Sequence, residues 1–288
     1  MQKITYTNDR GESVVLTHRA PFILSKIDGL GDVDADMQLQ KAPYQDGSTY
    51  IDSLLQPRFI NMEVSIYGTN RDDISLKRQE LGRIFNPKVG GTLLYENGRV
   101  KRKVKAYPEH VPKYPSSDRG GRHQISLVNL VCPNPYWQNA NESVEQLVTF
   151  SGGLTFPLQL PTIFGNQDST AKSRIMVNEG DSPTPIEVIF EGPATSPIRI
   201  ENETTGEFIE VAQNLLVGEK LWISTAFGKK RVEKISEDGA RANAFNYINL
   251  ESVFFQLLPG NNLMTYDTGE EYEKAPVTIK FYGRYIAV

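Results

Sequence analysis

The chain has 288 residues, with 31 lysine and arginine residues against 35 aspartate and glutamate residues. This slightly acidic balance argues against a nucleic-acid coat or a binder of anionic membranes, because each needs a basic excess on one face. A single cysteine excludes an internal disulfide, and no apolar run is long enough to cross a bilayer. We therefore expect a protein that is made in a reducing cytoplasm, does not insert into membranes and is long enough for two domains.

Alternation of apolar and polar residues predicts strands in the first half. Apolar residues occupy every second position of residues 32–40: Val33, Ala35, Met37 and Leu39. Residues 61–66 alternate in the same way, and both stretches have the pattern of half-buried strands. The first also begins like a calcium-binding loop, but Met37 and Pro43 stand where such a loop has glycine and glutamate. A strand without a metal ion is the better interpretation.

One helix is predicted, over residues 72–85. Asn70 or Thr69 can cap its N-terminus, two aspartates suit the positive end of the helix dipole, and Pro87 stops it. Its apolar stripe is narrow and consists of Ile74, Leu81, Ile84 and Phe85. We expect the helix to lie across a sheet or along a subunit boundary.

A basic run follows, in which every second residue is a cation: Arg99, Lys101, Lys103 and Lys105. On a strand these four side chains share one face. A nucleic-acid site is disfavoured because no aromatic residue interleaves with the cations before Tyr107. We expect either a sheet-edge strand protected by lysine or an interface with acidic residues of a neighbouring chain.

The segment Cys132-Pro133-Asn134-Pro135-Tyr136-Trp137 closes the first domain. Its two prolines fix φ and lack a backbone N–H, so a central strand cannot continue, and the aromatic pair can plug the base of the domain. We place the first domain at residues 1–138 and the second at residues 139–288. Cys132 has no basic neighbour and ends an apolar strand, so we expect a buried, inert thiol.

Short strands separated by turn sequences fill the second half, where helical periodicity is absent. The residues expected to face inward are Ile186, Val188, Phe190, Ile198, Ile200, Leu221, Ile223, Val277, Ile279 and Phe281. Their spacing is typical of a sandwich or jelly roll. The sequence as a whole therefore predicts a mainly β protein with one main helix.

No recognisable catalytic or cofactor-binding constellation is present. The three histidines, His18, His110 and His123, have no cysteine or carboxylate at metal-ligand spacing. No serine lies in a Gly-x-Ser-x-Gly elbow, and residues 28–31 are not followed by a helix, as a dinucleotide-binding loop requires. We expect no enzymatic activity, no metal and no cofactor.

An ordered series of short motifs runs through the chain. It consists of Phe22-Ile23-Leu24, Ile27-Asp28-Gly29-Leu30-Gly31, Asp46-Gly47-Ser48, residues 58–68, residues 81–87, residues 91–95, Asn178-Glu179-Gly180-Asp181, residues 198–202 with Thr204-Thr205-Gly206, and residues 254–262. In this order and at these separations, the chain resembles the distal tail protein family of long-tailed, non-contractile bacteriophages. The resemblance covers nearly the whole chain and rests on the series rather than on one motif.

The resemblance implies a structural protein of the virion tail that is synthesised and assembled in the cytoplasm of the bacterial host. It implies a homo-hexameric hub at the distal end of the tail. One face of the ring would meet the tail tube protein and the other the tail-tip protein, and DNA would pass through the channel. The implied fold is an N-terminal β-sandwich that builds the ring and a C-terminal galectin-like or jelly-roll β-sandwich on the outside.

The acidic strand of residues 32–40 is the candidate lining of this channel. We expect Asp32, Asp34 and Asp36 to face the lumen, because carboxylates repel DNA whereas a basic lining holds its phosphates. The competing interpretation places this strand opposite the cations of residues 99–105, with cross-strand ion pairs and no role in the lumen.

The alternative function is a carbohydrate-binding module that attaches the tail to host cell-wall saccharide. Its candidate contacts are Trp222, Phe227 and Tyr247. Exposed aromatic side chains in a concave groove favour this function, whereas aromatic side chains inside the sandwich favour a pure scaffold.

Overall fold

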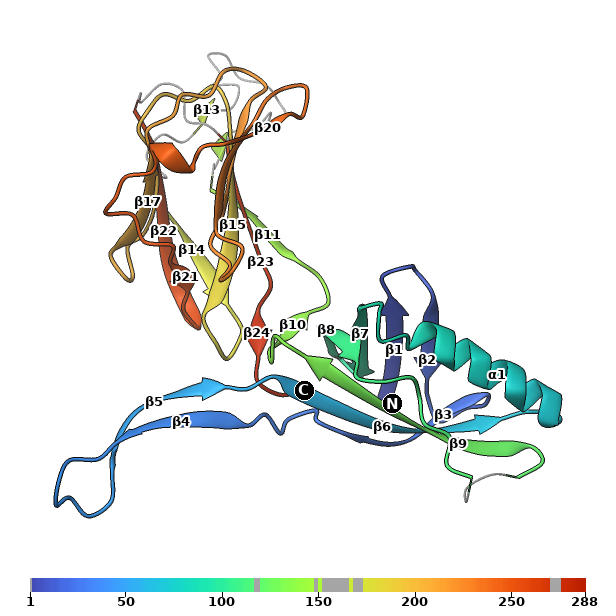
Figure 1. Ribbon diagram of the computed structural model, residues 1–288. Helices are drawn as coiled ribbons and strands as arrows, with labels where there is room; N and C mark the ends of the chain where they lie inside the picture. Colours follow the sequence, from blue (N-terminus) through green and yellow to red (C-terminus); the bar gives the residue numbers. More distant parts are fainter. Residues whose placement is uncertain (1, 117–119, 148–149, 152–165, 168–172, 270–275) are drawn as a thin grey trace, which may run out of the picture. The chain divides into compact units, whose positions relative to one another are not determined.

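A computed structural model describes residues 2–116, 120–147, 150–151, 166–167, 173–269 and 276–288 (Figure 1). The chain divides into two compact units, Met1–Ala140 with Tyr285–Val288, and Asn141–Arg284. Each unit has its own hydrophobic core. The last four residues, which the sequence analysis assigned to the second domain, belong to the first unit.

An antiparallel sheet forms the frame of the first unit. Its main path runs β2-β1-β7-β8-β9-β6-β3; β10 pairs with β8, and β24 pairs with β10. The strands are β1 (Gln2–Asn8), β2 (Ser13–Leu16), β3 (Phe22–Asp28), β6 (Arg58–Tyr67), β7 (Gly91–Asn97), β8 (Val100–Pro108), β9 (His123–Cys132), β10 (Trp137–Asn139) and β24 (Arg284–Tyr285). Full alternation of buried and half-buried residues along β9 shows that one face of this sheet covers the core.

Helix α1 (Arg71–Ile84) lies against one face of the sheet, and its predicted bounds are confirmed to within one residue (Figure 1). The Oδ1 atom of Asn70 caps the helix by accepting the backbone N–H of Asp73 at 2.9 Å. All four residues of the predicted apolar stripe are buried. Phe85 stacks on Tyr6 of β1 with 4.6 Å between the ring centroids, which anchors the end of the helix to the sheet.

The segment from Cys132 to Trp137 closes the core of the first unit. Trp137 is fully buried, and its indole N–H donates to the carbonyl oxygen of Leu30 at 3.1 Å. Cys132 is also fully buried, and desolvation raises the pKa of its thiol to about 12. The expected burial of this thiol is confirmed, but the expectation that it has no basic neighbour is wrong, because Arg58 of β6 lies opposite Cys132.

Strands β4 (Ala35–Gln40) and β5 (Thr49–Leu55) form a separate hairpin that projects from the sheet of the first unit (Figure 1). In the part of the chain that the structure describes, the two strands pair only with each other. The prediction that residues 32–40 form a half-buried strand is wrong, because Met37 and Leu39 are 59% and 58% exposed. Alternation buries a face only where another surface covers it, and the single chain supplies none here.

The second unit is a sandwich of two antiparallel sheets. One has the order β11-β23-β15-β18-β19-β20 with β21 beside β15, and the other has the order β14-β22-β16-β17. Their strands are β11 (Ser143–Gln146), β14 (Ser173–Asn178), β15 (Thr184–Glu191), β16 (Ile198–Asn202), β17 (Glu207–Val211), β18 (Lys220–Ser224), β19 (Arg231–Ile235), β20 (Arg241–Asn243), β21 (Gln256–Leu257), β22 (Gly260–Thr268) and β23 (Val277–Phe281). A small pair, β12 (Phe150–Ser151) and β13 (Asn166–Gln167), and a 3₁₀ helix, η1 (Phe245–Tyr247), complete the unit.

Every residue predicted to face inward in the second unit is buried in the core that the two sheets share. The predicted mainly β fold with one main helix is confirmed. Across the described residues, no helix has both the length and the apolar character that a membrane span requires.

Candidate assembly surfaces

The β4–β5 hairpin carries an apolar face and an acidic face. Met37 lies opposite Ser53 and Leu39 lies opposite Tyr50, so these residues share one face, on which Met37, Leu39 and Tyr50 are each more than half exposed. Asp36 lies on the other face, opposite Leu54. An isolated two-stranded hairpin is at best marginally stable in water. The hairpin therefore leaves an apolar face that the described part of the chain does not cover.

The three candidate channel residues lie at the base and on the first strand of this hairpin. Asp32 and Asp34 are exposed residues that precede β4, and Asp36 accepts a hydrogen bond from Nε2 of Gln38 at 2.9 Å. Because β4 pairs with β5 and not with β8, the competing interpretation of cross-strand ion pairs with the basic run is wrong. Pairing with a strand only nine residues downstream closes a short loop and costs less entropy than pairing with a distant strand.

The predicted basic face lies on β8, except that Arg99 falls in the turn before it. The expectation of an edge strand is wrong, since β8 lies between β7 on one side and β9 and β10 on the other. Lys101 pairs with Glu96 at 3.0 Å, and Lys105 pairs with Asp9. Two of the cations are therefore matched by carboxylates of their own chain, which leaves less charge for a neighbour.

Glu96 is the centre of this local charge network. It lies 2.7 Å from the ammonium group of Lys3 as well as beside Lys101. Hydrogen bonds from these two lysines lower the pKa of the Glu96 carboxyl. Strand β7 thus brings a carboxylate to the cations of both neighbouring strands, an arrangement that sequence spacing did not reveal.

The three candidate saccharide contacts lie on three different elements of the second unit. Trp222, on β18, is half-buried; its indole N–H donates to Glu187 at 3.3 Å, and the Arg241 guanidinium lies 5.2 Å from its ring centroid. Phe227, in the turn after β18, is 89% exposed, and Tyr247, on η1, is 51% exposed.

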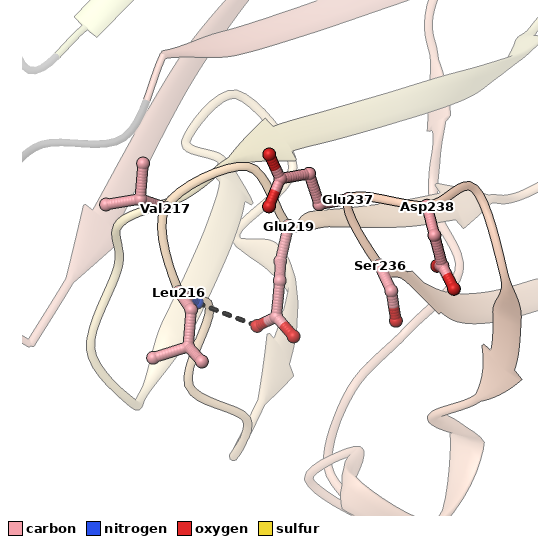
Figure 2. A pocket seen from close by; sticks show the side chains of 6 residues that line it. All are labelled: Leu216, Val217, Glu219, Ser236, Glu237 and Asp238. Atoms are coloured by element: carbon pink, nitrogen blue, oxygen red, sulfur yellow. Dashed lines mark hydrogen bonds between the residues drawn. The ribbon is translucent and has the colours of Figure 1, made fainter.

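Figure 2 shows a shallow hollow of about 560 Å³ in the second unit, lined by Leu216, Val217, Glu219, Ser236, Glu237 and Asp238. None of the candidate aromatic residues lines it. The Glu219 carboxylate accepts the Leu216 backbone N–H at 2.7 Å and pairs with Lys234 at 2.7 Å, which lowers its pKa. With no aromatic platform and one carboxylate already matched, the hollow offers little to a sugar ring.

No group of three or more histidine, cysteine and acidic residues in the described ranges is arranged to hold a metal ion.

Two family models match the chain, one in each unit. A phage tail protein RIFT-related domain matches residues 9–131, and the C-terminal domain of a siphovirus-type tail component matches residues 179–285. The chain belongs to the distal tail protein family of siphophages. Membership of this family makes the protein a structural component of the phage tail or baseplate.

Solved structures agree with the family assignment. The crystal structure of SPP1 Dit, described as a paradigm of the hub adsorption apparatus in phages infecting Gram-positive bacteria, has a TM-score of 0.70 at 14% identity and covers 98% of each chain. A chain of the phage P2 baseplate in its activated conformation with calcium has a TM-score of 0.53 at 10% identity, over 98% of this chain and 97% of that one. At these identities the likeness is one of fold. No curated protein sequence matches the chain.

The β4–β5 hairpin with its exposed apolar face was not predicted from the sequence. Asp46-Gly47-Ser48 lies between the two strands, and such a turn signal between two short runs rich in apolar residues is typical of a β-hairpin. That signal was present, but nothing in the local pattern distinguishes an apolar face that packs inside the chain from one that stays uncovered.

Proposed function

We propose that the protein forms a hexameric hub at the distal end of the phage tail, which joins the tail tube protein to tail-tip or baseplate proteins and leaves a channel for DNA. The observation that carries this proposal is the match of both units to tail-component families. The shared fold with SPP1 Dit, a protein described as part of a hub, supports it along almost the full length of both chains.

In this proposal the first unit supplies the ring contacts and the second unit lies at the periphery. The exposed apolar face of the β4–β5 hairpin supports this division, because a hairpin without a covering surface is stabilised by burial against another subunit. The second unit has a complete sandwich core of its own and does not need the ring to fold.

The mass and symmetry of the purified protein test the proposal. Native mass spectrometry and negative-stain images, with and without the tail tube protein, should show a ring-shaped hexamer. Assembly that needs the tube protein would still agree with the proposal, since a partner that binds only the assembled state shifts the equilibrium. A strictly monomeric species in the presence of the tube protein would contradict it.

The acidic residues at the hairpin are proposed to face the channel. Replacing Asp32, Asp34 and Asp36 by lysine should leave ring assembly intact and slow DNA ejection, because a basic lining retains phosphates through counterion release. The matched control replaces three exposed acidic residues of the second unit, Glu237, Asp238 and Glu251, by lysine. Normal ejection from assembled rings that carry the first set of changes would end the channel hypothesis.

A further inference from the structure

A groove runs along helix α1 of the first unit, between the helix and a second wall that includes Val111, Tyr114, Gly120 and Gly121. It consists of two adjoining hollows of about 370 and 380 Å³ that share Ser75 and Arg78. Arg71 and Gly82 extend the helix side of the groove at its two ends, and Val111 and Tyr114 line the opposite side. All of these residues belong to one compact unit, so the shape of the groove does not depend on ring formation.

The helix wall of the groove carries two arginines without a counter-charge. Arg71 and Arg78 are exposed, and neither forms an ion pair with another residue in the described ranges. Residues 71, 75, 78 and 82 share one helix face, and none of them is acidic. The nearby carboxylate of Asp73 is already held by Lys77 at 2.6 Å. Within the described residues, both guanidinium groups on this wall are therefore left without a carboxylate partner.

The Arg78 side chain is also held in place. Its guanidinium lies 4.3 Å from the centroid of the Tyr114 ring, and the Tyr114 hydroxyl donates to the backbone carbonyl of Arg78 at 2.8 Å. An arginine oriented on an aromatic ring loses less side-chain freedom when it binds a carboxylate than an arginine free in solvent.

Gly82 keeps the groove open without being required by the packing. A glycine inside a helix is less stable than alanine. A Cβ atom at this position would meet Cγ1 of Val111 at 3.7 Å, which is an ordinary contact. Packing around residue 82 would thus allow a side chain where the sequence has glycine. A side chain longer than alanine at residue 82 would enter the groove.

We propose that this groove binds an acidic, extended segment of another tail protein. Seven residues of helix separate the two arginines by about 10 Å. Three residues of extended chain span about 10 Å, so carboxylates three positions apart can reach both guanidinium groups. Each guanidinium presents a planar fork that matches a carboxylate, and such charge-assisted hydrogen bonds are the strong ones.

Fluorescence anisotropy with the full-length protein tests this proposal. The probe is a short fluorescein-labelled peptide with glutamate at every third position and serine between, and its control has glutamine in place of glutamate. The glutamate peptide should bind and the glutamine peptide should not. Replacing both arginines, Arg71→Gln and Arg78→Gln, should weaken binding at least about tenfold. The matched control is the double variant Arg10→Gln and Arg19→Gln, which removes two exposed arginines of the same unit outside the groove. It should change the affinity for the glutamate peptide less than about twofold.

Gly82→Leu gives a second, steric readout. It should weaken binding of the glutamate peptide about tenfold, while the melting temperature stays the same or rises because a helix-interior glycine is removed. Absence of binding, equal losses in the two arginine variants, or unchanged binding by Gly82→Leu would each overturn the proposal. Loss of self-association in the Arg71/Arg78 variant with unchanged peptide binding would assign the groove to a second copy of this chain and would overturn it too. The peptide assay measures binding whether the protein is monomeric or hexameric. Its outcome is therefore independent of the test of hexamer formation.

Discussion

At the scale of single residues, Arg58 ties three distant segments of the first unit together. Its side chain is 1% exposed and donates to the carbonyl oxygens of Gly29 and Pro135 at 2.8 Å each, and to that of Ile286. Desolvation lowers the pKa of the Arg58 guanidinium, although the group stays charged. Its five N–H donors, fixed in one plane, can serve three acceptors at once.

Replacing this arginine by a side chain of similar length without donors tests its role. Arg58→Met should destabilise the first unit by about 2–4 kcal/mol, because three backbone carbonyl groups, one of them in a fully buried hydrogen bond, lose their donor. Urea unfolding followed by labelling of Cys132 measures this, since the single cysteine is fully buried in the same unit. The exposed control Arg10→Gln should change stability by less than about 0.5 kcal/mol. Equal unfolding midpoints for the two variants would refute this account of Arg58.

At the scale of elements, the β4–β5 hairpin is the part of the first unit whose sequence and surroundings disagree. Strand β4 has the alternation of a half-buried strand, yet Leu39 on β4 and Tyr50 on β5 are 58% and 57% exposed. Helix α1 is the opposite case, because its stripe is narrow and fully covered by the sheet. The hairpin therefore carries apolar surface that the single chain leaves unused, which is the physical basis for placing it in a subunit contact.

Two substitutions on this face separate assembly from folding. Leu39→Ser with Tyr50→Ser should change the unfolding free energy of the monomer by less than about 0.5 kcal/mol, because both side chains are exposed. Self-association should weaken more than about tenfold, since burying two large apolar side chains contributes several kcal/mol. Sedimentation velocity measures this. Leu76→Ser with Val217→Ser, at positions that are 64% and 76% exposed outside the hairpin, is the control. Wild-type association of the hairpin variant would exclude the hairpin from the ring contacts.

At the scale of the whole molecule, the chain leaves the first unit after Ala140 and returns to it at Tyr285. Tyr285 is 8% exposed in the core of the first unit, and the guanidinium of Arg102 lies 3.6 Å from its ring centroid. Arg58 also donates a hydrogen bond to the carbonyl oxygen of Ile286. The last four residues therefore complete a core whose other residues all come from the first 140.

Fragments of the chain should behave accordingly. Residues 141–284 should unfold cooperatively when expressed alone, because both sheets and their shared core lie within them. Residues 1–140 should be at least about 3 kcal/mol less stable than the first unit of the full chain, since Tyr285 leaves the core. Linking residues 285–288 to residue 140 should restore that stability, and urea unfolding read by Cys132 labelling measures it. A fragment of residues 1–140 as stable as the intact first unit would contradict the role given to the C-terminal residues.

Several features of the fold could be predicted because they depend on neighbours in sequence. The helix from Arg71 follows from its Asn70 cap, its acidic first turn and its apolar spacing. The inward faces of the sandwich follow from a period of two, and the thiol of Cys132 from its apolar strand. The candidate sites were harder to predict from the sequence. The expected edge strand β8, for example, pairs with β9 and β10, which come later in the chain.

The sequence by itself determined the helix, the inward faces of the strands in the second unit, the end of the first core near Trp137 and, through its ordered motifs, the family. The tertiary structure alone decided which strands pair, which apolar faces stay uncovered and to which unit the last four residues belong. The physical reason is that periodicity and capping are short-range properties of the chain. Strand pairing and long-range hydrogen bonds depend on segments such as β8 and β10, or Arg58 and Ile286, which only the folded chain brings into contact.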